Sequence, residues 1–332
     1  MGFVRRVVTG HDASGREQIL SDGAPPKTIE APNGAGVSEL LVFESAPRDA
    51  RSGGDSAGPG FPLHPAPGGA TVRVIRLPAP AAGASGEERW LAVAGEDPER
   101  RGWHTTDTLD FELILDGEIA LGLDDGDHLL GRGDVVVQRA TGHRWRVVGD
   151  RPCTYLAVML RPDPKAPEPR VPLAPRAGAA GAPGPRRLVT ETGPDGRSRA
   201  ASFGPPPNVL QLGAPMEVTL SELWQTGGPL SRPEQGGDPA PGWSLEPQGR
   251  GIAFRMVELP AGHDPGDAGW HTTATIDVDV IVSGQVELAL PGVAPVVLGP
   301  GGAVIQRATV HRWRPVGPEP LRMAALMFGL PG

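Results

Sequence analysis

Histidine and carboxylate side chains with the spacing of a small chemical site occur twice in this chain. The segment Gly102–Gly117 reads GWHTTDTLDFELILDG, and Gly269–Gly284 reads GWHTTATIDVDVIVSG. After a turn, each is followed by a second shared segment, QRATGHRWR at Gln138–Arg146 and QRATVHRWR at Gln306–Arg314. Imidazole and carboxylate groups from two neighbouring strands are the donors that a small metal site needs. The chain is therefore a tandem repeat of one module that carries such a set.

The polar side chains of the first shared segment fall on alternate positions, which is typical of a β-strand. Successive side chains of a strand point to opposite faces. One face of the expected strand carries His104, Thr106, Thr108, Asp110 and Glu112, and the other carries Phe111, Leu113 and Leu115. The second copy repeats the polar row as His271, Thr273, Thr275, Asp277 and Asp279. We expect the polar face to line a cavity and the apolar face to pack in a core.

Length and composition predict an all-β protein with two modules. The chain has 332 residues, of which 48 are Gly and 39 are Pro, and this composition suits many short strands joined by turns. No convincing amphipathic helix of useful length is present. We expect an N-terminal module over residues 1–160, a Pro/Ala-rich linker over 161–185, and a C-terminal module over 186–332. Each module is large enough to bury its own core.

Charge and cysteine content exclude several classes of protein. A net charge of -8 argues against nucleic acid as a partner, because such proteins present a basic face to phosphates. Cys153 is the only cysteine, so neither a disulfide framework nor a multi-cysteine metal site is expected. No signal peptide or membrane-spanning run is evident. We expect a cytoplasmic protein that binds a small molecule and no membrane, and a homodimer is the one oligomer that we consider.

The two shared segments resemble the two motifs of the cupins, and the whole chain resembles a bicupin. The first cupin motif contains a His, a second His, a Glu and a Gly. Counting back from Gly117 places Asp110 at the Glu position, Thr106 at the second His position and His104 at the first. Gly284 leads in the same way to Asp277, Thr273 and His271, and the second motif ends at His143 and at His311. The resemblance implies two double-stranded β-helix (jelly-roll) barrels in tandem.

The departures from the cupin pattern leave two histidines and one carboxylate in each barrel. Thr replaces one histidine, and Asp replaces the longer Glu, in both copies. The resemblance then implies a divalent metal, Fe, Zn, Mn or Ni, held by His104, Asp110 and His143 and by His271, Asp277 and His311. The alternative is that these histidines pack against the barrel wall and bond to Thr or carboxylate, with metal absent from one or both barrels.

Further polar side chains of the two motifs are candidates for catalysis and substrate binding. Glu112 and Asp279 share the inward face and are candidate general bases, because burial raises the pKa of a carboxyl group. Arg139 and Arg307 offer planar guanidinium groups to a substrate carboxylate. The full set of candidate substrate-binding residues is Thr106, Gln138, Arg139 and Trp145 in the first copy and Thr273, Gln306, Arg307 and Trp313 in the second. The tryptophans suit core or rim packing equally well.

Three functions fit these residues. The first is a metal-dependent enzyme of secondary metabolism that acts on a small oxygenated organic acid or polyketide-like compound by lyase, isomerase or cyclase chemistry. The second is a non-haem iron dioxygenase, and the third is a non-catalytic or metal-free bicupin that binds a metabolite. The longer Glu112 and the flexible Gly142 favour the first copy as the more active one. Without metal, an acid–base site around Glu112 and Asp279 remains.

Overall fold

Nearly all regular structure in this protein is β-strand, as expected. The computed structural model describes residues 4–55, 61–62, 64–81, 83–93, 96–169, 173–179, 184–240 and 243–331. Within these ranges the helical elements are two single turns of 3-10 helix, η1 (Gly86–Arg89) and η2 (Gly266–Gly269). In the same ranges no helix has the length and apolar character to cross a membrane.

The strands of the two copies follow the same order along the chain. Those of the first copy are β1 (Arg6–His11), β2 (Glu17–Gly23), β3 (Thr28–Glu30), β4 (Gly36–Phe43), β5 (Ala70–Leu77), β6 (Leu109–Asp116), β7 (Ile119–Leu123), β8 (Gly126–Leu130), β9 (Val135–Arg139), β10 (Arg144–Val147) and β11 (Cys153–Leu160). Those of the second copy are β12 (Arg187–Thr192), β13 (Ser198–Gly204), β14 (Val209–Leu212), β15 (Val218–Gln225), β16 (Ile252–Leu259), β17 (Thr275–Ser283), β18 (Gln285–Ala289), β19 (Val296–Leu298), β20 (Ala303–Arg307), β21 (Arg312–Val316) and β22 (Leu321–Gly329).

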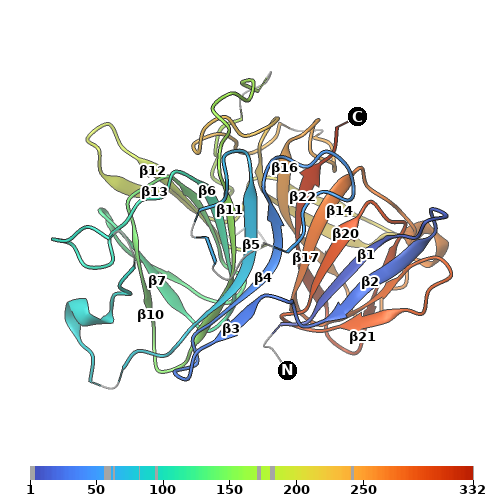
Figure 1. The fold of residues 1–332 in the computed structure, drawn as a ribbon, viewed down its shortest axis with the longest axis horizontal. Coiled ribbons are helices and arrows are strands. Elements are labelled where there is room, and N and C mark those ends of the chain that lie inside the picture. Colours follow the sequence, from blue (N-terminus) through green and yellow to red (C-terminus); the bar gives the residue numbers. More distant parts are fainter. Residues whose placement is uncertain are drawn as a thin grey trace.

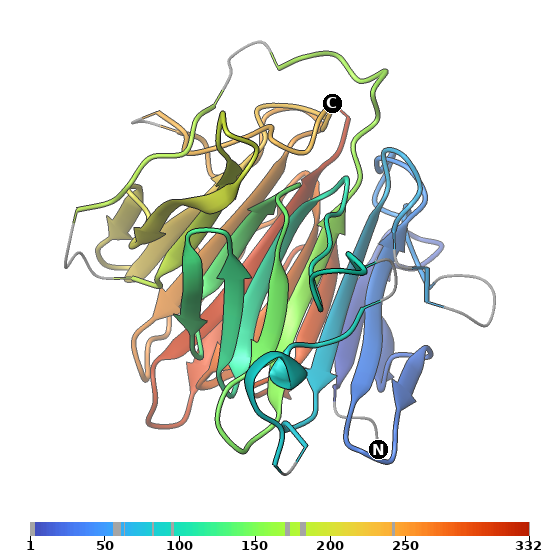
Figure 2. The same ribbon diagram turned by 90° about the vertical axis from the view of Figure 1, so that its left-hand side faces the viewer.

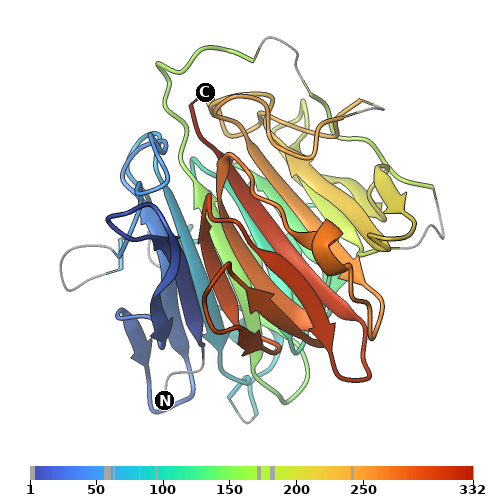
Figure 3. The ribbon, with the colours of Figure 1, turned by 90° about the vertical axis from the view of Figure 1, so that its right-hand side faces the viewer.

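Each copy forms a barrel from one large and one small sheet. The first barrel combines an eight-stranded sheet, β13-β12-β9-β6-β11-β5-β4-β3, with the sheet β10-β7-β8. The second combines β14-β15-β16-β22-β17-β20-β1-β2 with β19-β18-β21. Figures 2 and 3 show the small sheet of each barrel lying in front of its large sheet. Apolar side chains from both sheets fill the space between them, such as Ile114 with Leu121 and Ile281 with Leu288. The chain thus has the two-barrel cupin architecture that its motifs indicate.

The first hairpin of each copy belongs to the barrel of the other copy. Strand β1 runs parallel to β20, with Arg6 opposite Ala303, and β12 runs parallel to β9, with Arg187 opposite Val135. Figure 1 shows β1 and β2 beside the strands of the C-terminal half. The divisions expected at residues 160 and 186 separate the two repeats in sequence. In the fold, each repeat gives its first hairpin to the large sheet of the other.

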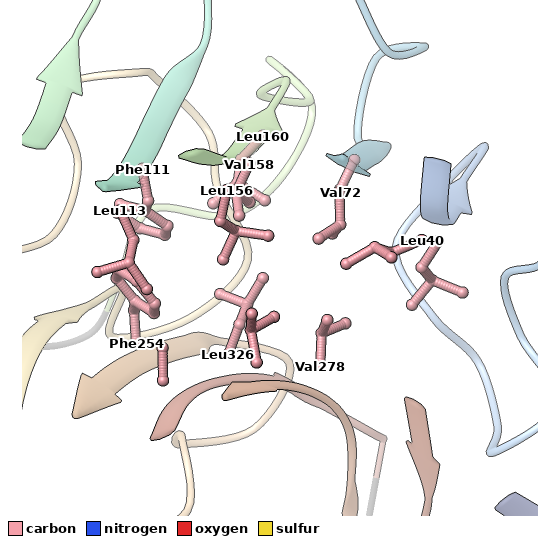
Figure 4. Packing of buried hydrophobic residues seen from close by; sticks show 14 of the residues in the cluster. Leu40, Val72, Phe111, Leu113, Leu156, Val158, Leu160, Phe254, Val278 and Leu326 are labelled. Carbon is pink, nitrogen blue, oxygen red and sulfur yellow. The ribbon is translucent and has the colours of Figure 1, made fainter. Parts of the chain in front are cut away.

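The apolar face of β6 packs against the other barrel, as the alternation predicts. Phe111, Leu113 and Leu115 lie in one buried cluster with residues of the second large sheet. The rings of Phe111 and Phe254 stack with centroids 5.0 Å apart, and Figure 4 shows this contact between the two sheets. Side chains on the opposite face of β6 point into the first barrel. The two barrels therefore share an apolar core, and each keeps its polar row on its own inner face.

A buried arginine at the start of each exchanged hairpin reaches back to its own copy. Arg187 donates to the Leu223 carbonyl oxygen at 2.7 Å and to both carboxylate oxygens of Asp238, at 2.7 and 3.0 Å. Arg6 makes the matching bonds to the Leu40 carbonyl and to Asp55. The Arg187 and Asp238 side chains are 1% and 0% exposed. A buried charge of this kind is stable only while its partner is present.

Part of the expected linker runs along the second module. The amide nitrogen of Asp163 donates to the Leu230 carbonyl, and Ala174 forms an isolated bridge with Asp238. The backbone nitrogen of Arg176 also donates to the Asp238 carboxylate, at 2.7 Å. The described linker residues are therefore tied to the same carboxylate that holds Arg187.

Substitution of Asp238 by alanine should destabilise the protein strongly. It leaves the Arg187 guanidinium buried without its counter-charge, which costs roughly 3–5 kcal/mol. The measurement is urea unfolding followed by fluorescence. Asp22→Ala serves as the control, because Asp22 pairs with Arg5 at the surface, and loss of that pair should cost less than about 1 kcal/mol. Equal losses in the two variants would contradict the structural role of the buried pair.

Candidate active site

The two histidines of each motif are brought together by backbone pairing ahead of the main strand. Strands β6 and β17 begin at Leu109 and Thr275, so His104 and His271 precede them. His104 instead forms an isolated bridge with His143, and His271 forms one with His311. The amide nitrogen of each residue donates to the carbonyl of the other at 2.9–3.0 Å. The first histidine is thus placed by its bridge to the second motif, whereas Asp110 and Glu112 follow the predicted alternation in β6.

All four histidines present the same ring nitrogen to the site. Nδ1 of His271 lies 2.9 Å from the Gly269 carbonyl oxygen, and Nδ1 of His311 lies 2.9 Å from that of Thr309. His104 and His143 repeat these contacts with Gly102 and Thr141. A carbonyl oxygen only accepts, so Nδ1 carries the hydrogen, and in a neutral ring the lone pair is then on Nε2. The ring centroids are 4.2 Å apart in the first barrel and 4.3 Å apart in the second.

Burial keeps the inner histidine of each pair neutral. Desolvation, and next to it the neighbouring histidine, lowers the pKa of His143 to about 3 and that of His311 to about 4. Both rings are 3% exposed. At neutral pH these imidazoles accept a hydrogen bond through Nε2 but carry no charge.

Two carboxyl groups on β17 form an acid–base pair inside the second barrel. Desolvation raises the pKa of Asp277 to about 6, against hydrogen bonds from Thr275 and Thr273 that lower it. Desolvation also raises the pKa of Asp279 well above its usual value, and the charge of Asp277 raises it further. Oδ2 of Asp277 accepts from the Thr273 hydroxyl at 3.1 Å, whereas the buried Oδ1 has no hydrogen-bond partner. Burial and the neighbouring carboxylate thus both favour the protonated form of Asp279.

The first barrel repeats the carboxyl pair. The Thr106 hydroxyl donates to Oδ2 of Asp110 at 3.0 Å, and Oδ1 is buried without a hydrogen-bond partner. Desolvation raises the pKa of Asp110 to about 7 and that of Glu112 well above its usual value, and Asp110 adds to the second shift. The expected rise in the pKa of Glu112 and Asp279 by burial is therefore confirmed. Because a raised pKa favours the protonated form, both residues suit the role of general acid better than that of general base.

The predicted three-residue metal sites are not assembled. In the part of the chain that the structure describes, no three His, Cys, Asp or Glu side chains are placed to hold a metal ion together. The histidines of each barrel do fit a metal, since Nε2 is unprotonated and Nδ1 is held by a carbonyl. The aspartate does not complete the set, and one of its oxygens bonds to Thr106 or Thr273. The expected ligand sets were His104, Asp110 and His143 in the first barrel and His271, Asp277 and His311 in the second. Among the described residues, the structure brings together the two histidines of each set but does not place the aspartate to bind a metal with them.

A cavity of about 360 Å³ opens onto the polar row of the second barrel. Its wall includes both histidines and both aspartates of that barrel, with Thr273 and Trp313. The remaining wall is largely apolar, with Met216, Val218, Leu220, Val257, Leu259 and Met323. In the first barrel the position of Met323 is held by Tyr155, whose ring stacks on Trp145 with centroids 6.5 Å apart. The cavity favours the second copy as the working site, in contrast to the preference expected from Glu112 and Gly142.

The two glutamines support the histidine loops. Oε1 of Gln306 accepts from the hydroxyls of Thr9 and Thr309 at 2.7 and 2.6 Å. Nε2 of Gln138 donates to the Thr141 carbonyl at 3.3 Å. Thr9 lies on the exchanged hairpin, and Thr309 precedes His311 by two residues. Gln306 is not part of the cavity wall, so its expected role in substrate binding is corrected to support of the loop that carries His311.

The expected role of Arg139 and Arg307 in binding a substrate carboxylate is also corrected. Cross-strand pairing places Arg139 opposite Leu109 and Arg307 opposite Ile276, on the outer apolar face of each large sheet. Arg139 donates to the Glu234 carbonyl at 2.6 Å. Arg307 donates to the carbonyls of Ala50, Ser52 and Gly53 at 2.8–3.1 Å. Each guanidinium therefore binds the backbone of the opposite copy.

A cationic residue of the cavity is absent from the sequence-based set. Arg255, on β16, is the sole arginine or lysine among the described residues of the cavity wall. It forms a buried ion pair with Glu222, and Arg73 forms the matching pair with Glu39 in the first barrel. Both residues of each pair lie at equivalent places in the two repeats, and this double repetition is the signal by which the sequence could have revealed them.

The chain is similar in sequence to three proteins that are named after biosynthesis clusters. No family model matches it. It is 31% identical over 153 residues to the phomopsin biosynthesis cluster protein C' of Diaporthe leptostromiformis, a match that covers 42% of this chain and 69% of the relative. Protein D of the same cluster matches with the same identity and coverage. The oryzines biosynthesis cluster protein J of Aspergillus oryzae is 49% identical over 45 residues, which cover 13% of this chain and 25% of that protein.

Solved structures resemble this chain more distantly. AerE from Microcystis aeruginosa superposes with a TM-score of 0.46 and 12% identity, over 92% of this chain and 97% of AerE. A cupin 2 conserved barrel domain protein from Leptotrichia buccalis has a TM-score of 0.40 and 7% identity, over 93% of this chain and 92% of that protein. Neither likeness bears on the reaction. The match in sequence does establish kinship: the chain belongs to the family of the phomopsin biosynthesis cluster proteins C' and D.

Proposed function

We propose that this protein is an enzyme of small-molecule biosynthesis whose second barrel moves a proton within a small oxygenated organic substrate. The reaction class is that of an isomerase, lyase or cyclase. The observation that carries the proposal is the pair Asp277 and Asp279, whose pKa values are both raised and whose side chains line one cavity. Relatives named as biosynthesis cluster proteins support the assignment to a biosynthetic pathway.

The two carboxyl groups divide the acid and base roles between them. Oδ1 of Asp277, which is buried without a hydrogen-bond partner, takes a proton from a carbon next to a substrate carbonyl. The electron pair of that C–H bond forms a C=C bond, and the carbonyl oxygen receives the proton of Asp279. In each outcome Asp279 then takes a hydroxyl proton and Asp277 gives up the one it gained. With a hydroxyl on the neighbouring carbon, that hydroxyl loses its proton to Asp279, a carbonyl forms there, and Asp277 protonates the former carbonyl carbon. Otherwise the enol loses its proton to Asp279, and its electrons expel a leaving group that Asp277 protonates, or attack a second carbonyl whose oxygen Asp277 protonates. These outcomes correspond to isomerase, lyase and cyclase chemistry, and the carboxyl pair ends each cycle with one proton.

The histidines and the threonine orient the reacting groups. His311 is neutral, and its Nε2 accepts a hydrogen bond from a substrate hydroxyl or from the enol. The Thr273 hydroxyl holds Oδ2 of Asp277 and so leaves Oδ1 facing the substrate. Trp313 forms an edge contact with His311, with centroids 5.7 Å apart, and adds apolar wall beside the polar row.

The metal-dependent form of this function, and the iron dioxygenase, both need a third ligand beside the histidines. Asp277 does not supply it in the described arrangement, so no step is assigned to a metal. Metal analysis of untagged protein separates these functions from the proton-transfer scheme. Near-stoichiometric Fe, Zn, Mn or Ni that is lost in the variant His271→Ala/His311→Ala would replace that scheme with a metal-based one.

Asp279→Asn should abolish proton transfer. The amide cannot deliver the proton to the carbonyl oxygen, and loss of one positioned acid lowers the rate roughly 100-fold or more. The measurement is hydrogen–deuterium exchange at the enolisable carbon of small ketones and 2-oxo acids, followed by NMR in D2O. Wild-type protein that exchanges no faster than buffer across such a panel would contradict the proposal. Loss of exchange in Glu112→Gln, with full activity in Asp279→Asn, would move the site to the first barrel.

The exchange rate should rise with pH through about 6. Asp277 acts as base only when it is ionised, and its pKa is raised to about 6, so the rate increases as pH passes this value. The rate falls at higher pH when Asp279 loses its proton. The measurement is kcat/KM for exchange as a function of pH. In Asp277→Asn the rising limb should disappear, and an unchanged limb would show that another group titrates there.

A further inference from the structure

We propose that Arg255 binds a carboxylate of the substrate in the second barrel. The substrate is then an organic acid with an apolar body, held so that the carbon next to its carbonyl lies beside Asp277 and Asp279. This inference rests on the proposed function for the identity of the site, but it concerns binding and can be tested without turnover.

Strand pairing places the guanidinium and the proposed acid at the same level of the barrel. Asp279 on β17 lies opposite Ala325 on β22, and Ala325 lies opposite Arg255 on β16. Paired residues point to the same face of a sheet, and neighbouring strands are about 4.8 Å apart, so the backbones of Asp279 and Arg255 are separated by roughly 10 Å. The side chain between them is a single methyl group. All three residues line the cavity, which therefore has room above Ala325 for a short acid.

The Arg255 guanidinium has a donor that the protein leaves unused. Its Nε is buried without a hydrogen-bond partner, whereas Nη2 is held in an ion pair. Nη2 lies 3.1 Å from Oε2 of Glu222 in an ion pair, and the guanidinium carbon lies 5.3 Å from the centroid of the Trp243 ring. Buried donors without partners are costly, and a guanidinium fork matches the two oxygens of a carboxylate. A bound acid would supply the missing partner.

Arg255 is the one guanidinium among several acidic groups around the described cavity wall. Burial raises the pKa of Glu222 to about 7, so near neutral pH this residue neutralises Arg255 only in part. The other acidic groups of the cavity wall are Asp277, Asp279 and Glu246. Of these, Asp279 has a pKa raised by burial and by the charge of Asp277, which favours its neutral form. No other arginine or lysine of the described wall competes for an anionic ligand.

The first barrel provides a matched control on the same chain. The same level there holds Glu112, Ala157, Arg73 and Glu39 on the equivalent strands. Nη2 of Arg73 pairs with Oε2 of Glu39 at 3.3 Å, and its Nε, like that of Arg255, has no hydrogen-bond partner. Tyr155, however, replaces the flexible Met323 beside this level. The two arginines thus occupy equivalent places with equivalent ion pairs and differ in the side chain beside them.

Phenylacetate and phenylacetamide test the inference, because they have the same shape and differ in charge. Isothermal titration of the full chain should show that phenylacetate binds roughly tenfold to a hundredfold more tightly. Arg255→Gln should remove this preference and leave the Kd of the amide unchanged, and Arg73→Gln should retain it. Wild-type protein that binds the two equally, or binds neither at millimolar concentration, overturns the inference. So does loss of the preference in Arg73→Gln alone.

A charge-matched variant and a complex structure guard against a folding defect. Glu222→Gln/Arg255→Gln removes both members of the buried pair, and thermal unfolding establishes that it is folded before titration. A crystal structure of wild-type protein with phenylacetate decides the matter directly: carboxylate oxygens within hydrogen-bond distance of Arg255 support the inference, and any other position overturns it. Carboxylate preference without proton exchange would leave Arg255 as the anchor of a binding protein, whereas exchange without the preference would leave only the proton-transfer function.

Discussion

The exchange of hairpins between the barrels is the constraint on which the rest of the molecule depends. Each large sheet is completed by two strands from the other copy, and each exchanged hairpin begins with a buried arginine that returns to its own copy. Between these two crossings lies a continuous apolar core, in which Phe111 stacks on Phe254. Separating the barrels would expose this core and leave Arg187 without its carboxylate, so the two copies are expected to unfold together.

The exchanged hairpin also helps to orient His311 in the second barrel. Thr9 on β1 bonds to Gln306 and to Thr309, and the carbonyl of Thr309 holds Nδ1 of His311. The orientation of the imidazole in the cavity thus depends on a hairpin that comes from the start of the chain. Thr190 gives the first barrel the corresponding contact through Thr141. Duplication therefore did not produce two independent sites, because the loop that carries the second histidine of each barrel is hydrogen-bonded to a threonine of the other copy.

Within this shared frame the two barrels have diverged at a few positions around an identical polar row. Both keep a bridged pair of histidines and a carboxyl pair in which desolvation raises both pKa values. They differ where Tyr155 replaces Met323. The second barrel has a cavity beside its polar row, and Tyr155 stands in the first barrel at the place of Met323, which lines that cavity.

Sequence by itself determined the repeat, the strand class and the inward row, because side-chain alternation with period two is a local property of extended backbone. Phe111 and Asp110 were assigned to opposite faces correctly on that basis. Only the tertiary structure decided which large sheet each hairpin joins, because parallel pairing of β1 with β20 leaves no local pattern. It also decided that Arg139 and Arg307 face the opposite copy, and that Arg255 faces the cavity. Those facings depend on which strands become neighbours, and contacts between residues far apart in the chain cannot be read from the spacing of residues along it.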